Sequence, residues 1–172
     1  MDRELILVRH AKSSWDDAYL DDHERPLNER GLRNAPEMGK RMQGWGIRPE
    51  VWMSSTAVRA ISTAEIIANQ LGFPNDQIKQ TKDLYHASAT ELQEFIGGLD
   101  DQFGTAILFG HNPGMTSLAA NLYGLHIDNI PTCGVVRLQF SENDWPTVSS
   151  TSPVRAYFDF PKNESGTPLR LA

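Results

Sequence analysis

Short apolar runs alternate with amphipathic stretches along this chain. Residues 4–9, 50–55 and 105–110 are apolar enough to be strands buried on both faces of a sheet, and 77–84 is a plausible further strand. Helices are expected in the intervening stretches, at residues 28–43, 56–72, 88–99 and 111–124. This alternation predicts an α/β fold of three layers, with a mostly parallel sheet covered by helices on both faces.

Capping residues mark where several of these helices begin and end. Asn28 is an expected N-cap, Gly72 is an expected C-cap, and Ser88 with Glu91 has the spacing of a capping box. Pro36 falls inside the first helix, where it either kinks the helix or starts its second segment.

The last third of the chain has a different pattern. Residues 134–140 and 154–160 have the composition of late strands, expected as a hairpin at an edge of the sheet. Residues 161–172 are expected to form a loosely held tail. No interior linker is apparent, so a single domain over residues 1–172 is predicted.

Composition and charge narrow the function classes. Forty per cent of the 172 residues are hydrophobic, which is enough for a substantial core, and the net charge is −6. This charge argues against a nucleic-acid partner and gives no support for binding to an anionic membrane. No stretch approaches the ~20 apolar residues of a membrane span, and no signal peptide is recognised. With Cys133 alone, no internal disulfide is possible, which favours a cytoplasmic location.

Charged and imidazole side chains follow three of the predicted strands. Arg9 and His10 end the first strand, Arg59 lies in the first turn of the helix after 50–55, and His111 with Asn112 follows 105–110. The carboxyl ends of parallel strands share one edge of a sheet, so these side chains should meet there. Such a basic cluster beside helix N-termini suits a phosphoryl dianion, and binding of phosphate or sulfate is expected.

The motifs that carry these residues resemble those of a known family. "LVRHAKSSW", "SSTAVRAISTAE" and "LFGHNPG", in this order and spacing, resemble the histidine phosphatase superfamily, which includes the phosphoglycerate mutases. With "DHERPLNERG" and "LYHAS" added, the chain is most similar to SixA-type phosphohistidine phosphatases, over roughly residues 5 to 125. The resemblance implies a phosphoglycerate mutase-like fold.

The same resemblance implies roles for the clustered residues. His10 would be the nucleophile and form a covalent phosphohistidine, Arg9 and Arg59 would grip the phosphoryl oxygens, and His111 would complete the pocket. Backbone N–H groups near Asn112 would add donors. Neither a metal nor another cofactor is implied.

Elementary chemistry agrees with these roles. A neutral imidazole can attack phosphorus, and arginine stays charged throughout such a reaction. Two neighbouring arginines should lower the pKa of His10 and keep it neutral, which predicts a bell-shaped or plateaued pH profile.

Two departures from the family pattern bear on activity. Ala11 replaces the glycine that usually follows the Arg-His pair. His86 stands where close relatives often carry a glutamate as proton donor, and Asp83 and Glu91 lie nearby in sequence. Cleavage of an N–P bond needs less acid assistance than cleavage of an alkyl phosphate, so phosphoramidate substrates are favoured and His86 is a possible proton donor.

Several further residues have both a functional and a plain interpretation. Ser13 and Lys12 are expected near the pocket mouth, with Ser13 as a phosphate donor, and Arg25 either orients substrate or braces the acidic loop. His23 and His126 are expected at the surface, and Cys133 as a buried small residue.

These observations predict a metal-independent phosphatase that acts through phospho-His10 on protein phosphohistidine. One alternative is a small-molecule phosphomonoesterase of the same mechanism. The other is a non-catalytic module that binds phosphate or a phosphoprotein. No nucleic acid or membrane partner is expected.

Overall fold

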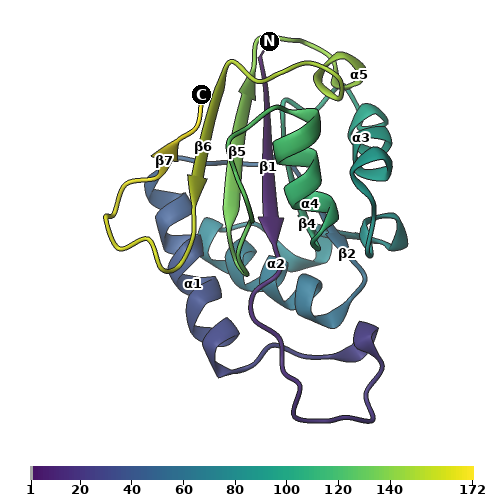
Figure 1. The fold of residues 1–172 in the computed structure, drawn as a ribbon, viewed down its shortest axis with the longest axis vertical. Coiled ribbons are helices and arrows are strands. Elements are labelled where there is room, and N and C mark those ends of the chain that lie inside the picture. The colour runs from purple at the N-terminus through teal and green to yellow at the C-terminus, as the bar shows by residue number, and fades with distance from the viewer. Residues whose placement is uncertain (1) are drawn as a thin grey trace.

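A seven-stranded sheet forms the centre of the computed structural model, which describes residues 2–172 (Figure 1). The strands lie in the order β3-β2-β4-β1-β5-β6-β7, with the first four parallel and the last three antiparallel to their neighbours. Their bounds are β1 (Arg3–Arg9), β2 (Val51–Ser55), β3 (Lys79–Thr81), β4 (Thr105–Gly110), β5 (Val135–Phe140), β6 (Arg155–Asp159) and β7 (Leu169–Arg170).

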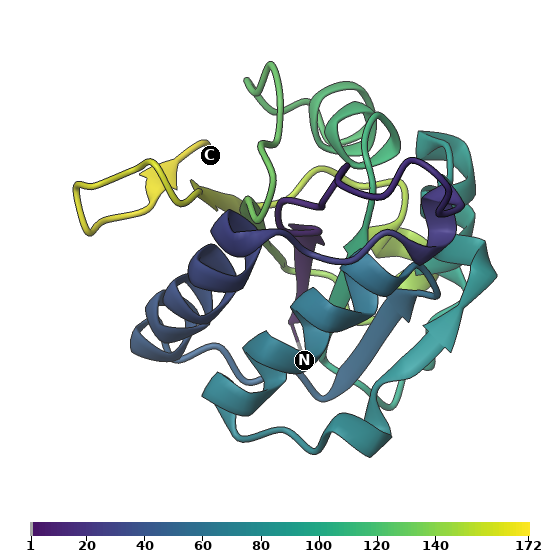
Figure 2. The ribbon, with the colours of Figure 1, turned by 90° about the horizontal axis from the view of Figure 1, so that it is seen from below.

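Helices cover both faces of this sheet. One face carries α1 (Glu29–Gly44) and α2 (Val58–Leu71), which pack on each other, and the other carries α3 (Ala89–Gly97), α4 (Gly114–Ser117) and α5 (Trp145–Val148) (Figures 1 and 2). Shorter turns complete the list: η1 (Asp22–Glu24), η2 (Asn75–Gln77), η3 (Lys82–Leu84) and the π turn η4 (Leu118–Leu122). The predicted three-layer α/β fold, with a mostly parallel central sheet, is confirmed.

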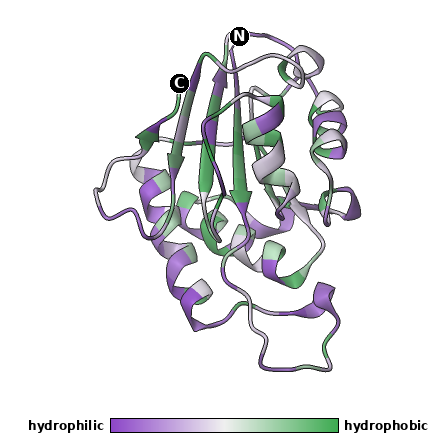
Figure 3. Ribbon diagram, viewed as in Figure 1, coloured by the Kyte–Doolittle hydropathy of each residue, from purple (hydrophilic) through white to green (hydrophobic). Residues whose placement is uncertain are grey.

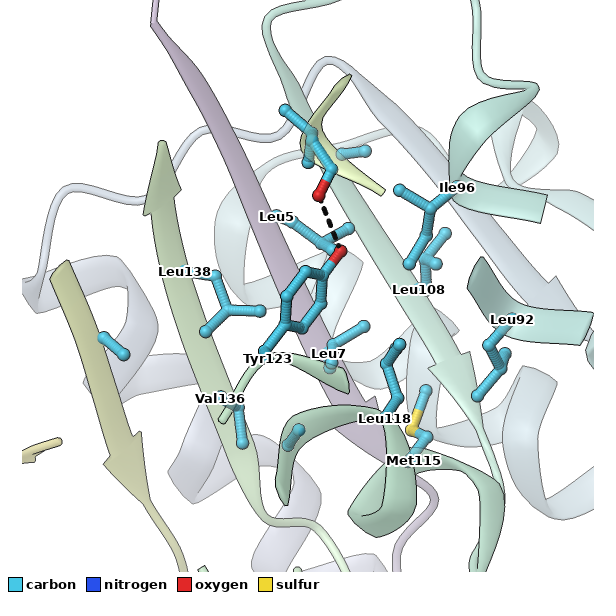
Figure 4. Packing of buried hydrophobic residues seen from close by; sticks show 14 of the residues in the cluster. Leu5, Leu7, Leu92, Ile96, Leu108, Met115, Leu118, Tyr123, Val136 and Leu138 are labelled. Atoms are coloured by element: carbon cyan, nitrogen blue, oxygen red, sulfur yellow. Dashed lines mark hydrogen bonds between the residues drawn. The ribbon is translucent and has the colours of Figure 1, made fainter. Parts of the chain in front are cut away.

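Strand β1 separates two hydrophobic cores. Leu5 and Leu7 point into the cluster beneath α3, α4 and α5, whereas Ile6 and Val8 point into the cluster beneath α1 and α2, and all four are fully buried. Figure 4 shows the first cluster, where the hydroxyl of Tyr123 donates to the carbonyl oxygen of Val148 at 3.3 Å. Burial on both faces explains the unbroken apolar run, which is also visible as hydrophobic strands in Figure 3.

The expected capping residues are confirmed. The Asn28 side chain accepts a hydrogen bond from the N–H of Gly31, and Ser88 and Glu91 form both bonds of a capping box. Gly72 ends α2 with a left-handed φ of 74°. Helix α1 is continuous through Pro36, so this proline does not start a second segment.

Some boundaries differ from the sequence expectation. β5 and β6 are antiparallel neighbours as predicted, but β5 also pairs with β1 inside the sheet, and α5 separates the two strands instead of a tight hairpin turn. The expected strand 77–84 is shorter, because η3 occupies its end, and the helix expected from residue 111 starts only at Gly114.

The C-terminal segment contains one further strand. Within residues 161–172, β7 pairs with β6, so this part of the expected loose tail is hydrogen-bonded to the sheet. Among the described residues, no helix has the length and apolar character needed to cross a membrane.

Candidate active site

The expected basic cluster lies at the carboxyl edge of β1, β2 and β4. Register pairs Arg9 with Gly110, so the following histidines, His10 and His111, lie side by side with ring centroids 5.1 Å apart. The first turn of α2 adds Arg59, whose Nη2 lies 3.4 Å from Nδ1 of His111. His10, Arg59 and His111 are 7%, 2% and 3% exposed. The predicted convergence of these strand ends is therefore found.

The ring of His10 has a defined tautomer. Its Nδ1 lies 2.7 Å from the carbonyl oxygen of Ala11, and a carbonyl only accepts, so Nδ1 carries the proton and Nε2 has a free lone pair. Burial lowers the pKa of His10 to about 3, with the charges of Arg59, Arg9 and Arg25 as smaller causes. The direction of the shift agrees with the sequence prediction, but burial acts more strongly than the arginines. The imidazole is neutral at pH 7.

His111 is also neutral. Its Nε2 lies 2.8 Å from the hydroxyl of Ser55, and its Nδ1 faces the guanidinium of Arg59. Burial lowers the pKa of His111 to about 2, followed by the effects of His10 and Arg59. Nδ1 accepts from an arginine that never loses its charge, so the proton of His111 belongs on Nε2.

A threonine of α2 ties two of these strand-end segments together. The hydroxyl of Thr63 accepts from the N–H of Ala11 at 2.9 Å and donates to the carbonyl of Arg59 at 2.7 Å. Ala11 is fully buried and does not have a positive φ, so alanine fits here without the backbone freedom of glycine.

Both arginines keep a buried donor without a protein partner. Arg9 donates from Nη1 to the carbonyl of Ile130 at 3.0 Å, and Arg59 donates from Nη1 to the carbonyl of Asp22 at 2.6 Å. The Nε atoms of Arg9 and Arg59 are buried and make no hydrogen bond to the described residues. Burial and the charge of Arg59 lower the pKa of Arg9. Buried cationic donors without partners suit the oxygens of a bound oxyanion.

One carboxylate at the pocket mouth collects donors from three segments. Oδ2 of Asp22 accepts from Arg59 Nη2 at 2.9 Å, the Tyr85 hydroxyl at 2.6 Å and His86 Nε2 at 2.9 Å, while Oδ1 accepts from Arg25. Partial burial alone would raise the pKa of Asp22, but the hydrogen bonds from Tyr85, His86 and Arg59 outweigh it and hold the pKa well below its ordinary value. Asp22 is therefore ionised and is not a proton donor at neutral pH.

Asp22 and Tyr85 were not among the site residues expected from the sequence. A signal was present in the spacing of Asp22 and Arg25, which places the two side chains one turn apart across η1, where they form an ion pair at 3.1 Å. Tyr85 adjoins the suspected His86, but its bond to Asp22 spans 63 residues and has no local signal.

His86 lies at the outer rim of the cluster. Its side chain is 48% exposed, its ring centroid is 4.8 Å from that of His111, and its backbone has a left-handed φ of 51°. The carboxylate of Glu91 is instead used by the capping box, where hydrogen bonds to Ser88 lower its pKa. His86 is thus the better placed of the two to donate a proton to a group that enters the mouth.

The remaining candidates hold the loops around the cluster. Arg25 donates to the hydroxyl of Ser13 at 2.8 Å and to the carboxylate of Asp22, which is the bracing role considered for it. The Asn112 amide donates to the carbonyl of Ile130 and accepts from Thr116, so this side chain fastens its own loop. Ser13 and Arg25 are buried beside the cluster, and their role toward phosphate stays a prediction.

Cys133 is fully buried, and its backbone N–H lies 3.0 Å from the carbonyl oxygen of His10. Burial raises the pKa of its thiol to about 12, which excludes a thiolate nucleophile at neutral pH. Among residues 2–172, no group of three or more His, Cys, Asp or Glu side chains is arranged to hold a metal ion.

Comparisons with known proteins point to one family. The profile of the histidine phosphatase superfamily (branch 1) matches residues 5–94. An uncharacterized chloroplastic protein of Arabidopsis thaliana is 33% identical over 151 residues, which are 83% of this chain and 69% of that protein. The mitochondrial serine/threonine-protein phosphatase Pgam5 of Drosophila persimilis is 33% identical over 99 residues, 55% of this chain and 32% of its own length, so this chain spans about a third of that relative.

Solved structures show the same fold. A provisionally assigned phosphohistidine phosphatase SixA from Agrobacterium tumefaciens is 26% identical, with a TM-score of 0.72 over 79% of this chain and 90% of that one. A protein histidine phosphatase SixA complexed with tungstate has a TM-score of 0.73 at 19% identity, over 91% of this chain and 94% of that one. The profile match covers more than half of the chain and includes the Arg9-His10 and Arg59 motifs. This chain belongs to the histidine phosphatase superfamily and is of the SixA type.

Proposed function

We propose that this protein is a metal-independent phosphatase that uses His10 as its nucleophile and removes phosphate from protein phosphohistidine. Superfamily membership supports a phosphatase hydrolase. The observation that carries the proposal is the neutral His10 ring, with Nδ1 bound to the Ala11 carbonyl and Nε2 unprotonated, beside the half-buried Arg9 and the buried Arg59. A lone pair beside two fixed cations is what attack on a phosphoryl group requires.

The first step transfers the phosphoryl group to the enzyme. The lone pair on Nε2 of His10 forms a bond to phosphorus while the bond from phosphorus to the leaving nitrogen breaks. Arg9 and Arg59 neutralise the phosphoryl oxygens, and their partnerless Nε–H groups supply buried donors. The leaving nitrogen takes a proton from His86, whose Nε2 is held by Asp22.

The second step returns the enzyme to its resting state. Water attacks phospho-His10 in line, the bond from phosphorus to Nε2 breaks, and inorganic phosphate is released. His86 accepts the proton that the water loses, which restores the proton it gave in the first step. His10 leaves this step neutral, as it began, and burial favours that form.

The lack of a free carboxylic acid beside Asp22 and His86 favours phosphohistidine over an alkyl phosphate as the substrate. Asp22 is ionised and Glu91 is engaged in the capping box, so neither offers the carboxylic acid that an alkoxide leaving group needs. An imidazole leaving group needs only a weak proton donor such as His86.

We also propose a reducing, cytoplasmic compartment for this protein, because its single thiol, Cys133, is buried and unpaired.

A phosphomonoesterase of the same mechanism is the second candidate. It is favoured by the relatives that act on esters by name, namely Pgam5 and a 2,3-bisphosphoglycerate-dependent phosphoglycerate mutase of a Methylobacterium strain, 34% identical over 77 residues. A third candidate, a phosphate-binding or phosphoprotein-binding module without turnover, would not need an unprotonated nucleophile.

One comparison of rates tests the proposal. We expect kcat/KM for a phosphohistidine peptide to exceed that for an alkyl phosphate by about 100-fold or more, because only the alkoxide needs a strong acid. Comparable rates would favour the phosphomonoesterase. A protein that binds phosphate but hydrolyses neither substrate would be the binding module.

A further inference from the structure

The segment that follows β1 forms a closed loop beside the candidate active site. The N–H of Ser14 donates to the carbonyl of Pro26 at 2.8 Å, and Ser13 and Leu27 form an isolated antiparallel bridge. These contacts join the two ends of residues 14–26, here called the 14–26 loop. The loop projects below the carboxyl edge of the sheet in Figure 1 and crosses the face seen in Figure 2.

One end of the 14–26 loop forms a wall of the pocket mouth. Asp22 is bound to Arg59, Tyr85 and His86, and its Oδ1 accepts from Nη2 of Arg25 at 3.1 Å. A protein that presents a phosphoryl group to His10 past Asp22 therefore comes close to the outer part of this loop.

The outer part presents apolar side chains to solvent. Trp15, Tyr19 and Leu20 are 72%, 98% and 40% exposed, and they are three of the seven large hydrophobic side chains exposed in the described chain. Trp15 is not loose, since the guanidinium of Arg25 lies 3.6 Å from its ring centroid. The N–H of Tyr19 donates to Oδ1 of Asp17 at 2.9 Å, which fixes the turn that carries the tyrosine. Exposed aromatic side chains on a backbone that is held in place mark a surface for a partner.

The same part of the loop is strongly acidic. Residues 15–24 contain five Asp or Glu and neither Lys nor Arg, whereas the whole chain has a net charge of −6. Asp22 is paired with arginines and Glu24 with His23 at 2.9 Å. Asp16, Asp17 and Asp21 are exposed and form no ion pair among the described residues. This surface attracts cationic groups and repels an acidic face.

We propose that the 14–26 loop is the docking surface for the protein substrate, and that the phosphohistidine of that substrate lies on a face rich in Lys or Arg and in apolar side chains. This inference rests on the proposed function and adds the chemistry of the partner. Trp15, Tyr19 and Leu20 supply the apolar contact, and Asp16, Asp17 and Asp21 supply the charge complementarity. A small phosphate ester needs neither, because it reaches His10 without covering the loop.

Two peptides and one small substrate test this proposal. Each peptide carries a single phosphohistidine flanked by Leu and by one type of charged residue. The charged residue is Lys in one peptide and Glu in the other. The small substrate is 4-nitrophenyl phosphate. We expect the wild type to prefer the Lys peptide by about 10-fold or more in kcat/KM, and we expect high salt to reduce this preference. Tyr19→Ala should lower kcat/KM for the Lys peptide about 5-fold or more and change aryl phosphate hydrolysis less than about twofold.

Val154→Ala is the matched control, because Val154 is 56% exposed and precedes β6 at the opposite edge of the sheet. It should change neither rate. Combined Asp16→Asn and Asp21→Asn should reduce the charge preference about threefold or more, because only Asp17 of the three exposed carboxylates remains.

Equal rates on the two peptides, with Tyr19→Ala unchanged, would overturn the docking surface and leave the proposed function standing. A wild type that hydrolyses 4-nitrophenyl phosphate but neither peptide would overturn both.

Discussion

Acidification should destabilise this fold through its two site histidines. His10 and His111 are 7% and 3% exposed and are neutral in the folded state, with pKa values of about 3 and about 2. An unfolded histidine has a pKa near ~6.5. Between these values the unfolded chain binds protons that the folded chain does not, so the free energy of unfolding rises with pH in this window.

The loss of the free energy of unfolding at low pH can be estimated from these pKa differences. Each histidine contributes its full stabilisation above pH ~6.5 and loses it progressively as the pH falls toward its folded pKa. At pH ~5, about 1.5 units below the unfolded pKa, each loss is roughly 2 kcal/mol, so the two together lower the free energy of unfolding by about 4 kcal/mol relative to pH ~8. Both side chains are buried, so solvent screening reduces this figure little.

Urea unfolding at several pH values between ~8 and ~5 measures this dependence. His111→Gln should remove about half of the pH dependence, because one of the two neutral buried histidines is gone. His126→Gln is the control, because His126 is exposed, and it should keep the wild-type slope. An unchanged slope in His111→Gln, or histidine resonances that show both groups titrating near pH ~6.5, would show that these buried histidines do not cause the pH dependence.

Three other substitutions probe the site and its frame. Arg59→Met should lower kcat/KM for an aryl phosphate by about 10²–10³-fold, with the circular dichroism spectrum unchanged, because a fixed phosphoryl clamp is lost; a loss under about fivefold contradicts that role. Asp22→Asn should lower the free energy of unfolding by about 1–2 kcal/mol in urea titrations, since Arg59 loses a charged partner that is itself 42% exposed; unchanged stability would show that the pair contributes nothing. Gly114→Ala should destabilise by about 1–3 kcal/mol in thermal unfolding, because an added Cβ would lie 1.9 Å from the carbonyl oxygen of Ala87, and a wild-type melting temperature would contradict this packing.

Local signals accounted for most of the fold. The apolar runs of β1, β2 and β4 and the caps at Asn28 and Ser88 depend on neighbouring residues, so they could be recognised in the sequence. The place of β5 was not predictable in this way. Its pairing with β1 depends on the packing of the whole sheet, and the composition of residues 134–140 indicates a strand without indicating its neighbours.

The residues of the candidate site also differ in how far the sequence could predict them. His10, Arg59 and His111 each follow a recognisable strand, and parallel topology brings such strand ends together. Asp22 lies in a polar loop that has no periodic pattern, and its partner His86 is 64 residues away. The backbone of His86 has a left-handed φ of 51°, which non-glycine residues adopt uncommonly and which the sequence around it did not predict.

Trapping the phosphorylated enzyme tests the role of His10 directly. Wild-type protein and His10→Asn are incubated with a ³²P-labelled phosphohistidine peptide, quenched in alkali, digested and analysed by mass spectrometry. We expect an acid-labile, alkali-stable phosphoryl group on His10 of the wild type and none on the variant. A wild type that turns over without any such label, or a His10→Asn variant that is labelled and active to the same extent, would contradict this role of His10.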